Sequence, residues 1–379
     1  MKRLISIVVS LAILAVIYWK LNQHGQLAEL GKVFAQCDRA WMAASLAMVV
    51  PLTLFTSWRL QQLMPRVAAT PSSPEVSEAP LPPLIAKGGE GAASTLGFGE
   101  ANKLILVASV LNLVLPSKMG DIAKAWFMRE RGHMSGALSL SLVVFEKATD
   151  MLSLLWWCVF GLAWVRLSGG DAMRAFDPAT WKVQLNLHLA LPSWLGADFI
   201  FWCFFLVVLG SLAIGTLLIG SQNFARFFFE IGEKFAPTKI GGKLAKLQAA
   251  WSEMHGYFWK SKKQLIKVSL TSVFIWFLHL LQIWMFILAL RAWTPFFANL
   301  ALSPLAILAG LLPLTFAGVG TRDAALVLFY APYFSAPVAA ALGILCTARY
   351  LLPALGGAPF AGEYFQLVRR EKNAQKVSF

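Results

Sequence analysis

Residues 112–126, NLVLPSKMGDIAKAW, interrupt a long apolar region and decide how the chain has to fold. A proline, a serine, a lysine, a glycine and an aspartate all fall within residues 116–121, and a helix-forming run resumes after them. Backbone that leaves a helix inside a lipid bilayer is tolerated only where it is buried in protein or lines a water-filled cavity. The meaning of the interruption therefore depends on whether the surrounding chain belongs in a bilayer.

The composition places the surrounding chain in a membrane. Of the 379 residues, 58% are hydrophobic and only 14% are charged, and the mean hydropathy is +0.64. Soluble domains carry about 25% charged residues. The apolar runs are continuous, whereas the strands of a membrane β-barrel alternate over about ten residues. The sequence therefore predicts an all-α, polytopic bundle of membrane helices.

The net charge of +14 has an ordinary explanation in such a protein. Lysine and arginine collect in cytoplasmic loops and face anionic lipid. No nucleic-acid-binding motif accompanies the charge, so no nucleic-acid partner is expected. The four cysteines are scattered without the spacing of metal ligands, so neither a metal nor another cofactor nor a disulfide framework is predicted; they are Cys37, Cys158, Cys203 and Cys346.

Six apolar runs approach or exceed the length of about 20 residues that a membrane span needs. They are residues 4–19, 40–57, 136–165, 198–220, 265–290 and 336–355. The loop 221–264 carries eight lysines and arginines against three glutamates, and the tail is also basic. The excess of positive charge on cytoplasmic loops then places both termini of this multi-pass protein on the cytoplasmic side of the inner membrane.

Two further apolar stretches, 104–115 and 303–317, are too short to cross. Proline, glycine and charged residues follow each one, and then a short helical run at 120–131 or 321–331. The number of crossings agrees with the loop charges only if each stretch enters and leaves on one side. The sequence thus predicts two re-entrant broken-helix hairpins related as an inverted repeat, which is a transporter architecture. Two unrelated helix breaks would give the same spacing, and that alternative stays open.

This interpretation divides the chain into six segments. They are two spans at 1–66, a flexible cytoplasmic linker at 67–100, the first hairpin with two spans at 101–220, a basic cytoplasmic loop at 221–264, a span with the second hairpin and the last span at 265–360, and a basic tail at 361–379. The linker is rich in proline, serine, alanine and glycine. Within the basic loop, residues 243–258 have the pattern of an amphipathic helix, which either lies on the membrane surface or packs against the protein.

The first predicted hairpin carries positive charge at its tip. Pro116 and Gly120 suit a turn, because one lacks an N–H and the other permits unusual dihedral angles. Asn112 is predicted to hydrogen-bond across this hairpin. The helix that follows presents free N–H groups at its N-terminus, which attract anions such as phosphate. Lys118 and Lys124 would add to that attraction.

The second predicted hairpin repeats these features. Its turn runs from Pro313 through Gly318 and Gly320 to Arg322 and Asp323. An arginine guanidinium can hold a phosphate with two hydrogen bonds, and an arginine deep in lipid needs a strong reason to be there.

Two aspartates at these turns also have a purely structural explanation. Asp121 and Asp323 would each stabilise the first turn of a helix. Lys124 follows Asp121 by three residues and could be its partner in a helical ion pair.

The third span contains ionisable residues in the sequence FEKATDML, residues 145–152. Glu146, Lys147 and Asp150 lie well inside the apolar run, and intramembrane charges are functional hypotheses by default. Arg322 and Arg349 are the candidate partners for the carboxylates. An ion pair that only holds the bundle together is an equally good explanation.

The two hairpins and the third span resemble the membrane region of lysylphosphatidylglycerol synthases and their stand-alone flippase-like relatives. The residues that carry the resemblance are Asn112, Pro116, Gly120, Asp121, Lys124, Glu146, Lys147, Asp150, Pro313, Ala317, Gly318, Gly320, Arg322, Asp323 and Arg349. Lys147 replaces an arginine of the family pattern, Ala317 a glycine and Asp323 a glutamate, so a different substrate is expected. The resemblance implies lipid translocation. It does not imply synthesis, because only a short basic tail follows the last span where the best-known members carry an aminoacyl-transfer domain.

The sequence therefore predicts a non-enzymatic protein that moves a phospholipid or a polyprenyl-phosphate-linked lipid between leaflets. Its expected partners are membrane lipids, chiefly anionic ones, with a homo-oligomer or a lipid-synthesising enzyme as further partners left open. Two alternatives also stay open: a membrane transferase that modifies a lipid headgroup with Glu146 or Asp150 as base, and a non-catalytic subunit of an envelope-biogenesis complex.

Overall fold

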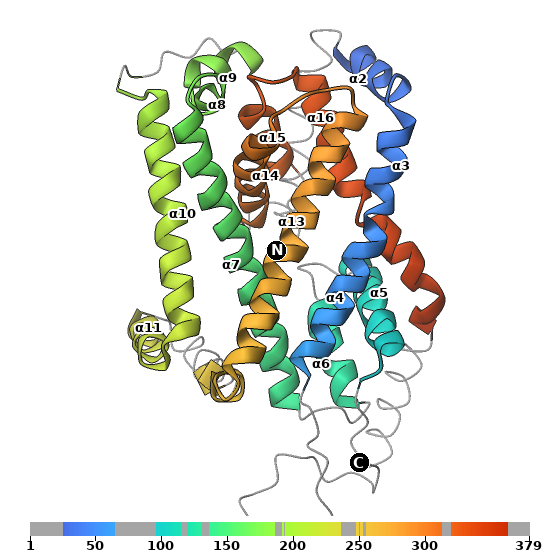
Figure 1. Ribbon diagram of the computed structural model, residues 1–379, viewed down its shortest axis with the longest axis vertical. Coiled ribbons are helices and arrows are strands. Elements are labelled where there is room, and N and C mark those ends of the chain that lie inside the picture. Colours follow the sequence, from blue (N-terminus) through green and yellow to red (C-terminus); the bar gives the residue numbers. More distant parts are fainter. Residues whose placement is uncertain are drawn as a thin grey trace, which may run out of the picture. The chain divides into compact units, whose positions relative to one another are not determined.

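A computed structural model describes residues 26–64, 96–114, 120–130, 136–185, 192, 194–235, 248–249, 251–252, 255–312 and 320–362. Every regular element in this part of the chain is a helix (Figure 1). Five of the described helices are long and apolar enough to cross a membrane; they are Arg39–Leu63, Ser141–Ser168, Ala197–Gly220, Lys262–Ala289 and Ala336–Gly362. The protein is therefore an all-α polytopic membrane protein, as predicted.

The described spans match five of the six predicted ones, and the run 4–19 lies outside the described residues. The first of them is formed by α3 (Arg39–Ala47) and α4 (Val49–Leu63), preceded by α2 (Gln26–Ala35). The Asp38 carboxylate caps α3 by accepting hydrogen bonds from the backbone N–H of Ala40 at 2.9 Å and of Trp41 at 3.1 Å. This cap satisfies two of the N–H groups that a helix start leaves without partners.

The other helices alternate between long spans and short segments. They are α5 (Phe98–Val114), α6 (Gly120–Glu130), α7 (Gly136–Ser168), α8 (Asp171–Arg174), α9 (Pro178–Leu185), α10 (Ala197–Gly220), α11 (Gln222–Phe235), α13 (Lys262–Ala289), α14 (Phe296–Leu311), α15 (Thr321–Phe329) and α16 (Ala336–Ala348). A last helix covers residues 351–362. Helix α5 begins inside the final residues of the predicted linker, most of which lies outside the described residues.

The helices group into two compact units. Unit 1 comprises Met1–Leu52, Asp150–Thr216 and Ser272–Leu352, and unit 2 comprises Thr53–Thr149, Leu217–Thr271 and Pro353–Phe379. Each unit holds one pair of short helices where the sequence predicts a hairpin. Helix α14 packs against α15 in unit 1, and α5 packs against α6 in unit 2. The paired short helices are thus confirmed, while their re-entrant course and inverted relationship stay predictions.

Unit 1 is built around α14. Residues 298–306 of this helix are all buried, and its core contacts include Leu162 on α7, Phe201 on α10 and Phe329 on α15. A Cβ atom added to Gly161 of α7 would lie 2.3 Å from the backbone nitrogen of Ala301. The two helices therefore touch backbone to backbone, which only a glycine at this position allows.

Unit 2 uses the same kind of contact around α5. A Cβ atom on Gly120 of α6 would lie 2.2 Å from the carbonyl oxygen of Ala108, and one on Gly357 would lie 2.3 Å from that of Leu106. Two further helices are therefore held against α5 at backbone distance. On another side of the unit, the rings of Phe145 and Phe258 stack with their centroids 3.9 Å apart.

Helices α10 and α11 present apolar side chains to the outside. Only 6% of the most apolar part of α10 is buried, as expected for a helix that faces lipid. Helix α11 exposes Phe227, Phe228 and Ile231, while its opposite face carries Arg226 and Glu230. This pattern is typical of a helix lying in the membrane interface. The sequence analysis counted these residues as loop and did not predict α11.

Half of the residues of the predicted amphipathic helix at 243–258 lie outside the described residues, and the described ones are helical. The indole of Trp251, within that segment, donates a hydrogen bond to the carbonyl of Leu218 at 3.1 Å, and Trp259 donates to that of Ile219 at 3.0 Å. These carbonyls belong to the last turn of α10, where a helix has no backbone donors left for them. At Trp251 the segment thus contacts the end of α10, and whether it also lies on the membrane surface stays a prediction.

Candidate functional site: two buried charge clusters

Unit 2 buries three charged side chains from three helices. Glu146 on α7 accepts a hydrogen bond from Arg59 on α4, with 2.8 Å between Nη2 and Oε1. The ammonium group of Lys124 on α6 donates to the other carboxylate oxygen. The three side chains are only 1–2% exposed. We call this set of two cations and one anion the Glu146 cluster.

The cluster explains how these charges can be buried. An isolated charge in the interior costs far more than a folded protein can offset, so a buried charge requires a partner. Sharing one carboxylate between an arginine and a lysine ties α4, α6 and α7 together. A second pair lies nearer the surface, where Lys147 Nζ is 3.1 Å from Asp121 Oδ2 and the lysine is 47% exposed.

These contacts correct two expectations from the sequence. Glu146 is paired with Arg59 and Lys124, and neither Arg322 nor Arg349 is its partner. Lys124 does not form the helical ion pair with Asp121, which contacts Lys147 instead. Arg59 was missed because it lies two residues beyond the predicted run 40–57. The sequence did point to Arg59, because the span Arg39–Leu63 contains no charged residue other than Arg39 at its start and Arg59 in its interior.

The first hairpin is joined by the predicted Asn112 hydrogen bond. The backbone N–H of Gly120 donates to Asn112 Oδ1 at 2.9 Å, which confirms the prediction and links α5 to α6. A Cβ atom at Gly120 would lie 2.8 Å from the same oxygen, so the contact itself requires glycine. Pro116 and Lys118 lie outside the described residues, and Asp150 is half-buried on α7.

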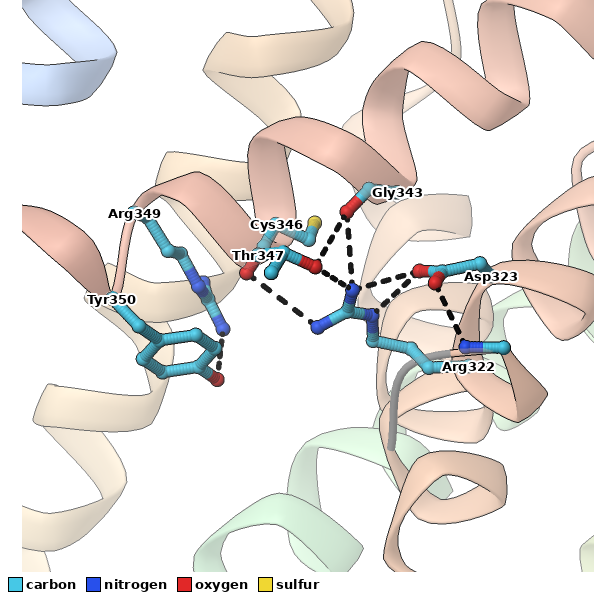
Figure 2. Close-up of polar contacts among 8 residues, drawn as sticks. Arg322, Asp323, Gly343, Cys346, Thr347, Arg349 and Tyr350 are labelled. Atoms are coloured by element: carbon cyan, nitrogen blue, oxygen red, sulfur yellow. Dashed lines mark hydrogen bonds and ion pairs between the residues drawn. The ribbon is translucent and has the colours of Figure 1, made fainter. Parts of the chain in front are cut away.

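Unit 1 contains a second cluster, around Arg322 on α15. Figure 2 shows its guanidinium group between Asp323 and the end of α16. The Asp323 Oδ1 atom accepts from Nη2 at 2.7 Å and from Nε at 3.1 Å. The Nη2 atom also donates to Thr347 Oγ1 at 2.7 Å and to the carbonyl of Gly343 at 3.0 Å, and Nη1 lies 3.5 Å from that of Cys346. Arg322 is 7% exposed.

These hydrogen bonds occur where the last span is broken. Helix α16 ends at Ala348, and the final helix begins at residue 351. Pro353 explains the break, because its ring has no N–H and clashes with the carbonyl of the residue four positions earlier. Arg322 joins α15 to the last two turns of α16 through the Gly343 carbonyl and the Thr347 hydroxyl. The sequence analysis had treated residues 336–355 as one uninterrupted span.

Both carboxylate oxygens of Asp323 make structural contacts. One carboxylate oxygen binds Arg322, and the other accepts a hydrogen bond from the backbone N–H of Gly320 at 3.0 Å. It thereby caps the start of α15, as the structural explanation predicted. Gly320 has φ of +101°, which favours glycine. A Cβ atom on Gly343 would lie 2.8 Å from Asp323 Oδ1, so α16 also needs glycine there.

Arg349 is the second buried arginine of unit 1. It is 5% exposed and lies at the break in the last span (Figure 2). Its Nη2 atom donates to the Tyr350 hydroxyl at 3.0 Å, and Nη1 is 3.5 Å from Gln282 Oε1. Its buried Nε atom has no hydrogen-bond partner. Within the described part of the chain, no carboxylate lies within ion-pair distance of Arg349. Pro313 and Gly318 of the same predicted site lie outside the described residues.

The fold and these clusters define an integral membrane protein whose helical units each contain buried charges beside a pair of short helices. Residues 4–357 match the family model described as the lysylphosphatidylglycerol synthase TM region, so the chain belongs to that family. The resemblance seen in the sequence is thereby confirmed. Comparison with curated proteins found no match, and comparison with solved structures found none either.

Proposed function

We propose that the protein carries a phospholipid or a polyprenyl-phosphate-linked lipid between the leaflets of the cytoplasmic membrane, as a transporter and not as an enzyme. Membership of the family supports a role in lipid handling at the membrane. The observation that carries the proposal is the presence of buried arginine and lysine side chains in both units. Charged groups inside a membrane protein are candidates for ion and substrate pathways.

In this proposal the headgroup travels past the buried cations while the acyl chains stay in lipid. The two pairs of short helices dip into the bilayer from opposite sides, and both termini lie in the cytoplasm. Anionic lipids are the preferred substrates because the buried side chains of the described residues include more cations than carboxylates: Arg59, Lys124, Arg322 and Arg349 against Glu146 and Asp323.

The test is reconstitution of the full chain in liposomes containing phosphatidylethanolamine labelled with a dye on its headgroup. Labelling removes the amine charge, so this probe carries a single phosphodiester charge. Membrane-impermeant dithionite bleaches the dye in the outer leaflet, and a transporter exposes the protected inner dye as well. The R349Q variant is expected to slow that second phase. The matched control is R174Q, because Arg174 is a 62% exposed surface residue.

Two outcomes would contradict the proposal. If the inner-leaflet dye stays protected with every anionic lipid tested, the chain does not translocate lipid. If the lipid changes only when an activated donor is added, headgroup modification by a membrane transferase replaces transport. Normal translocation by R349Q would remove Arg349 from the pathway.

A further inference from the structure

We infer that Arg349 is the residue that binds the lipid phosphate in unit 1, that Tyr350 closes this binding site, and that Arg322 holds the broken span together without binding substrate. This assignment deepens the proposed function and rests on it for the identity of the substrate as a lipid. It differs from the sequence-based expectation, which gave the phosphate-binding role in the second hairpin to Arg322.

Arg322 is already engaged by the protein. Its guanidinium group binds Asp323 through two nitrogen atoms, so its charge is neutralised by a carboxylate at 2.7 Å. Its Nη2 atom also donates to the Gly343 carbonyl and the Thr347 hydroxyl on α16, while Nη1 has only a long contact with the Cys346 carbonyl. A phosphate at Arg322 would have to compete with the Asp323 carboxylate and disrupt the link between α15 and α16.

Arg349 has the opposite environment. Normal N–H···O hydrogen bonds measure about 2.7–3.2 Å, and only the one to Tyr350 falls in that range. The contact with Gln282 is 3.5 Å long, and the Gln282 side-chain nitrogen is held by the carbonyl of Ser45 at 2.8 Å. The neighbours that contact the guanidinium group are therefore neutral. A charged group that is 5% exposed, with one N–H lacking an acceptor, has the surroundings expected of an anion-binding site.

Tyr350 is the residue that separates Arg349 from the outside. Its side chain is 46% exposed, in contrast to the buried arginine that it contacts. Its hydroxyl accepts from Nη2, and the guanidinium carbon of Arg349 lies 5.0 Å from the centre of its ring. Both contacts are lost together when the ring turns away, which frees the donors of Arg349. Tyr350 lies in the Ala336–Gly362 span, which is long and apolar enough to cross a membrane.

The chemistry of the site selects a phosphodiester with one negative charge. The planar fork of a guanidinium group matches two phosphate oxygens, which gives two parallel hydrogen bonds. Among the described residues no carboxylate pairs with Arg349, so it supplies one positive charge, and the neutral partners Gln282 and Tyr350 add none. A headgroup with a single phosphodiester charge, such as phosphatidylglycerol, fits this balance. Phosphatidylcholine, whose charges cancel, does not.

The inference is tested by binding, separately from transport. The purified full chain in detergent micelles is titrated with radiolabelled phosphatidylglycerol, and in a parallel series with phosphatidylcholine. We expect R349Q to lower the affinity for phosphatidylglycerol by about tenfold, which corresponds to about 1.4 kcal/mol, and to leave phosphatidylcholine unaffected. R349K keeps the positive charge but lacks the planar guanidinium group that makes two parallel hydrogen bonds. Its affinity for phosphatidylglycerol should therefore lie between those of R349Q and the wild type. R174Q is the matched surface control.

Two further variants separate binding from folding and test the role of Tyr350. R349Q should leave the thermal unfolding midpoint unchanged or raise it, because it removes a buried charge that has no carboxylate partner. R322Q should lower the midpoint. Y350A should speed phosphatidylglycerol association, since it removes the ring that covers Arg349, whereas unchanged or slower association would contradict the role assigned to Tyr350.

The outcomes distinguish this inference from the proposed function. Equal phosphatidylglycerol affinity in R349Q and the wild type overturns the inference, even if the chain translocates lipid. A lower midpoint in R349Q overturns it too, because it makes Arg349 a structural residue. Binding that depends on Arg349 in a protein that fails to translocate lipid keeps the inference and removes the proposed function.

Discussion

The two units bury charge in different ways, and the difference separates a structural cluster from a binding site. In unit 2, one carboxylate on Glu146 receives two cations from two other helices. In unit 1, the carboxylate of Asp323 receives one cation, Arg322, and the other buried arginine contacts only neutral groups in the described part of the chain. A carboxylate shared by two cations fixes helices in place. A cation without a carboxylate is available to a ligand.

The largest expected effect concerns the side of the membrane from which each hairpin enters. A cysteine placed just before each hairpin should react with a reagent on one side of the membrane and not with the same reagent on the other side. In a background without Cys37, Cys158, Cys203 and Cys346, single cysteines replace Gly97 before α5 and Trp293 before α14, both of which are exposed. A membrane-impermeant maleimide should label G97C only in inside-out vesicles and W293C only in right-side-out vesicles. Labelling of both positions from one side would rule out the inverted relationship of the two hairpins.

The next effect is the loss of the carboxylate in unit 2. E146Q leaves Arg59 and Lys124 buried without that carboxylate, and breaking a buried pair in this way costs about 3–5 kcal/mol. We expect a large fall in the thermal unfolding midpoint in detergent. The triple variant R59M/K124M/E146M replaces all three charges by apolar side chains and should recover much of the stability. An E146Q protein as stable as the wild type would show that the cluster is not what holds α4, α6 and α7 together.

A similar effect is expected from Arg322 in unit 1. R322Q removes the cation of the buried Asp323 carboxylate, which keeps its Gly320 hydrogen bond, and breaking a buried pair in this way costs about 3–5 kcal/mol. The measurement is the unfolding midpoint compared with that of R349Q. The comparison between the two arginines fails if R349Q is destabilised as much as R322Q.

The smallest effect concerns the packing of α15 against α16. In G343A, the new methyl group would lie 2.8 Å from Asp323 Oδ1, and overpacking of this kind costs about 1–3 kcal/mol. G210A on α10 is the matched control, because no atom lies within 4 Å of the new methyl group. Its midpoint should equal or exceed that of the wild type, since alanine favours a helix more than glycine does. Equal midpoints for both variants would mean that the two helices are not in close contact.

The sequence was sufficient for features that depend on local chemistry. Apolar length alone located the spans around α7, α10 and α13, because a bilayer imposes that length on any helix that crosses it. The Asn112–Gly120 contact was also accessible, since a polar side chain beside a predicted turn needs a nearby partner. The short helix α15 was predicted close to its observed start, whereas α14 begins at Phe296, seven residues before the predicted stretch 303–317.

The features that the sequence analysis missed depend on which helices meet. Lys124 and Glu146 are close only because α6 packs near α7, and nothing in their spacing favours this pair over Lys124 with Asp121. The break at Arg349 was hidden because hydropathy is continuous from Ala336 to Gly362, with Pro353 as the only local sign. Helix α11 was hidden because the lysines and arginines of 221–264 marked the whole segment as a loop.

The contact at Gly161 limits how unit 1 can change shape. Because α7 and α14 meet backbone to backbone, no side chain at that point can switch rotamer to let one helix slide along the other. These two helices are therefore expected to move together. Tyr330, at the end of α15, donates a hydrogen bond to Asn299 Oδ1 of α14 at 2.8 Å, and Arg322 joins α15 to α16, so both helices are coupled to the same pair.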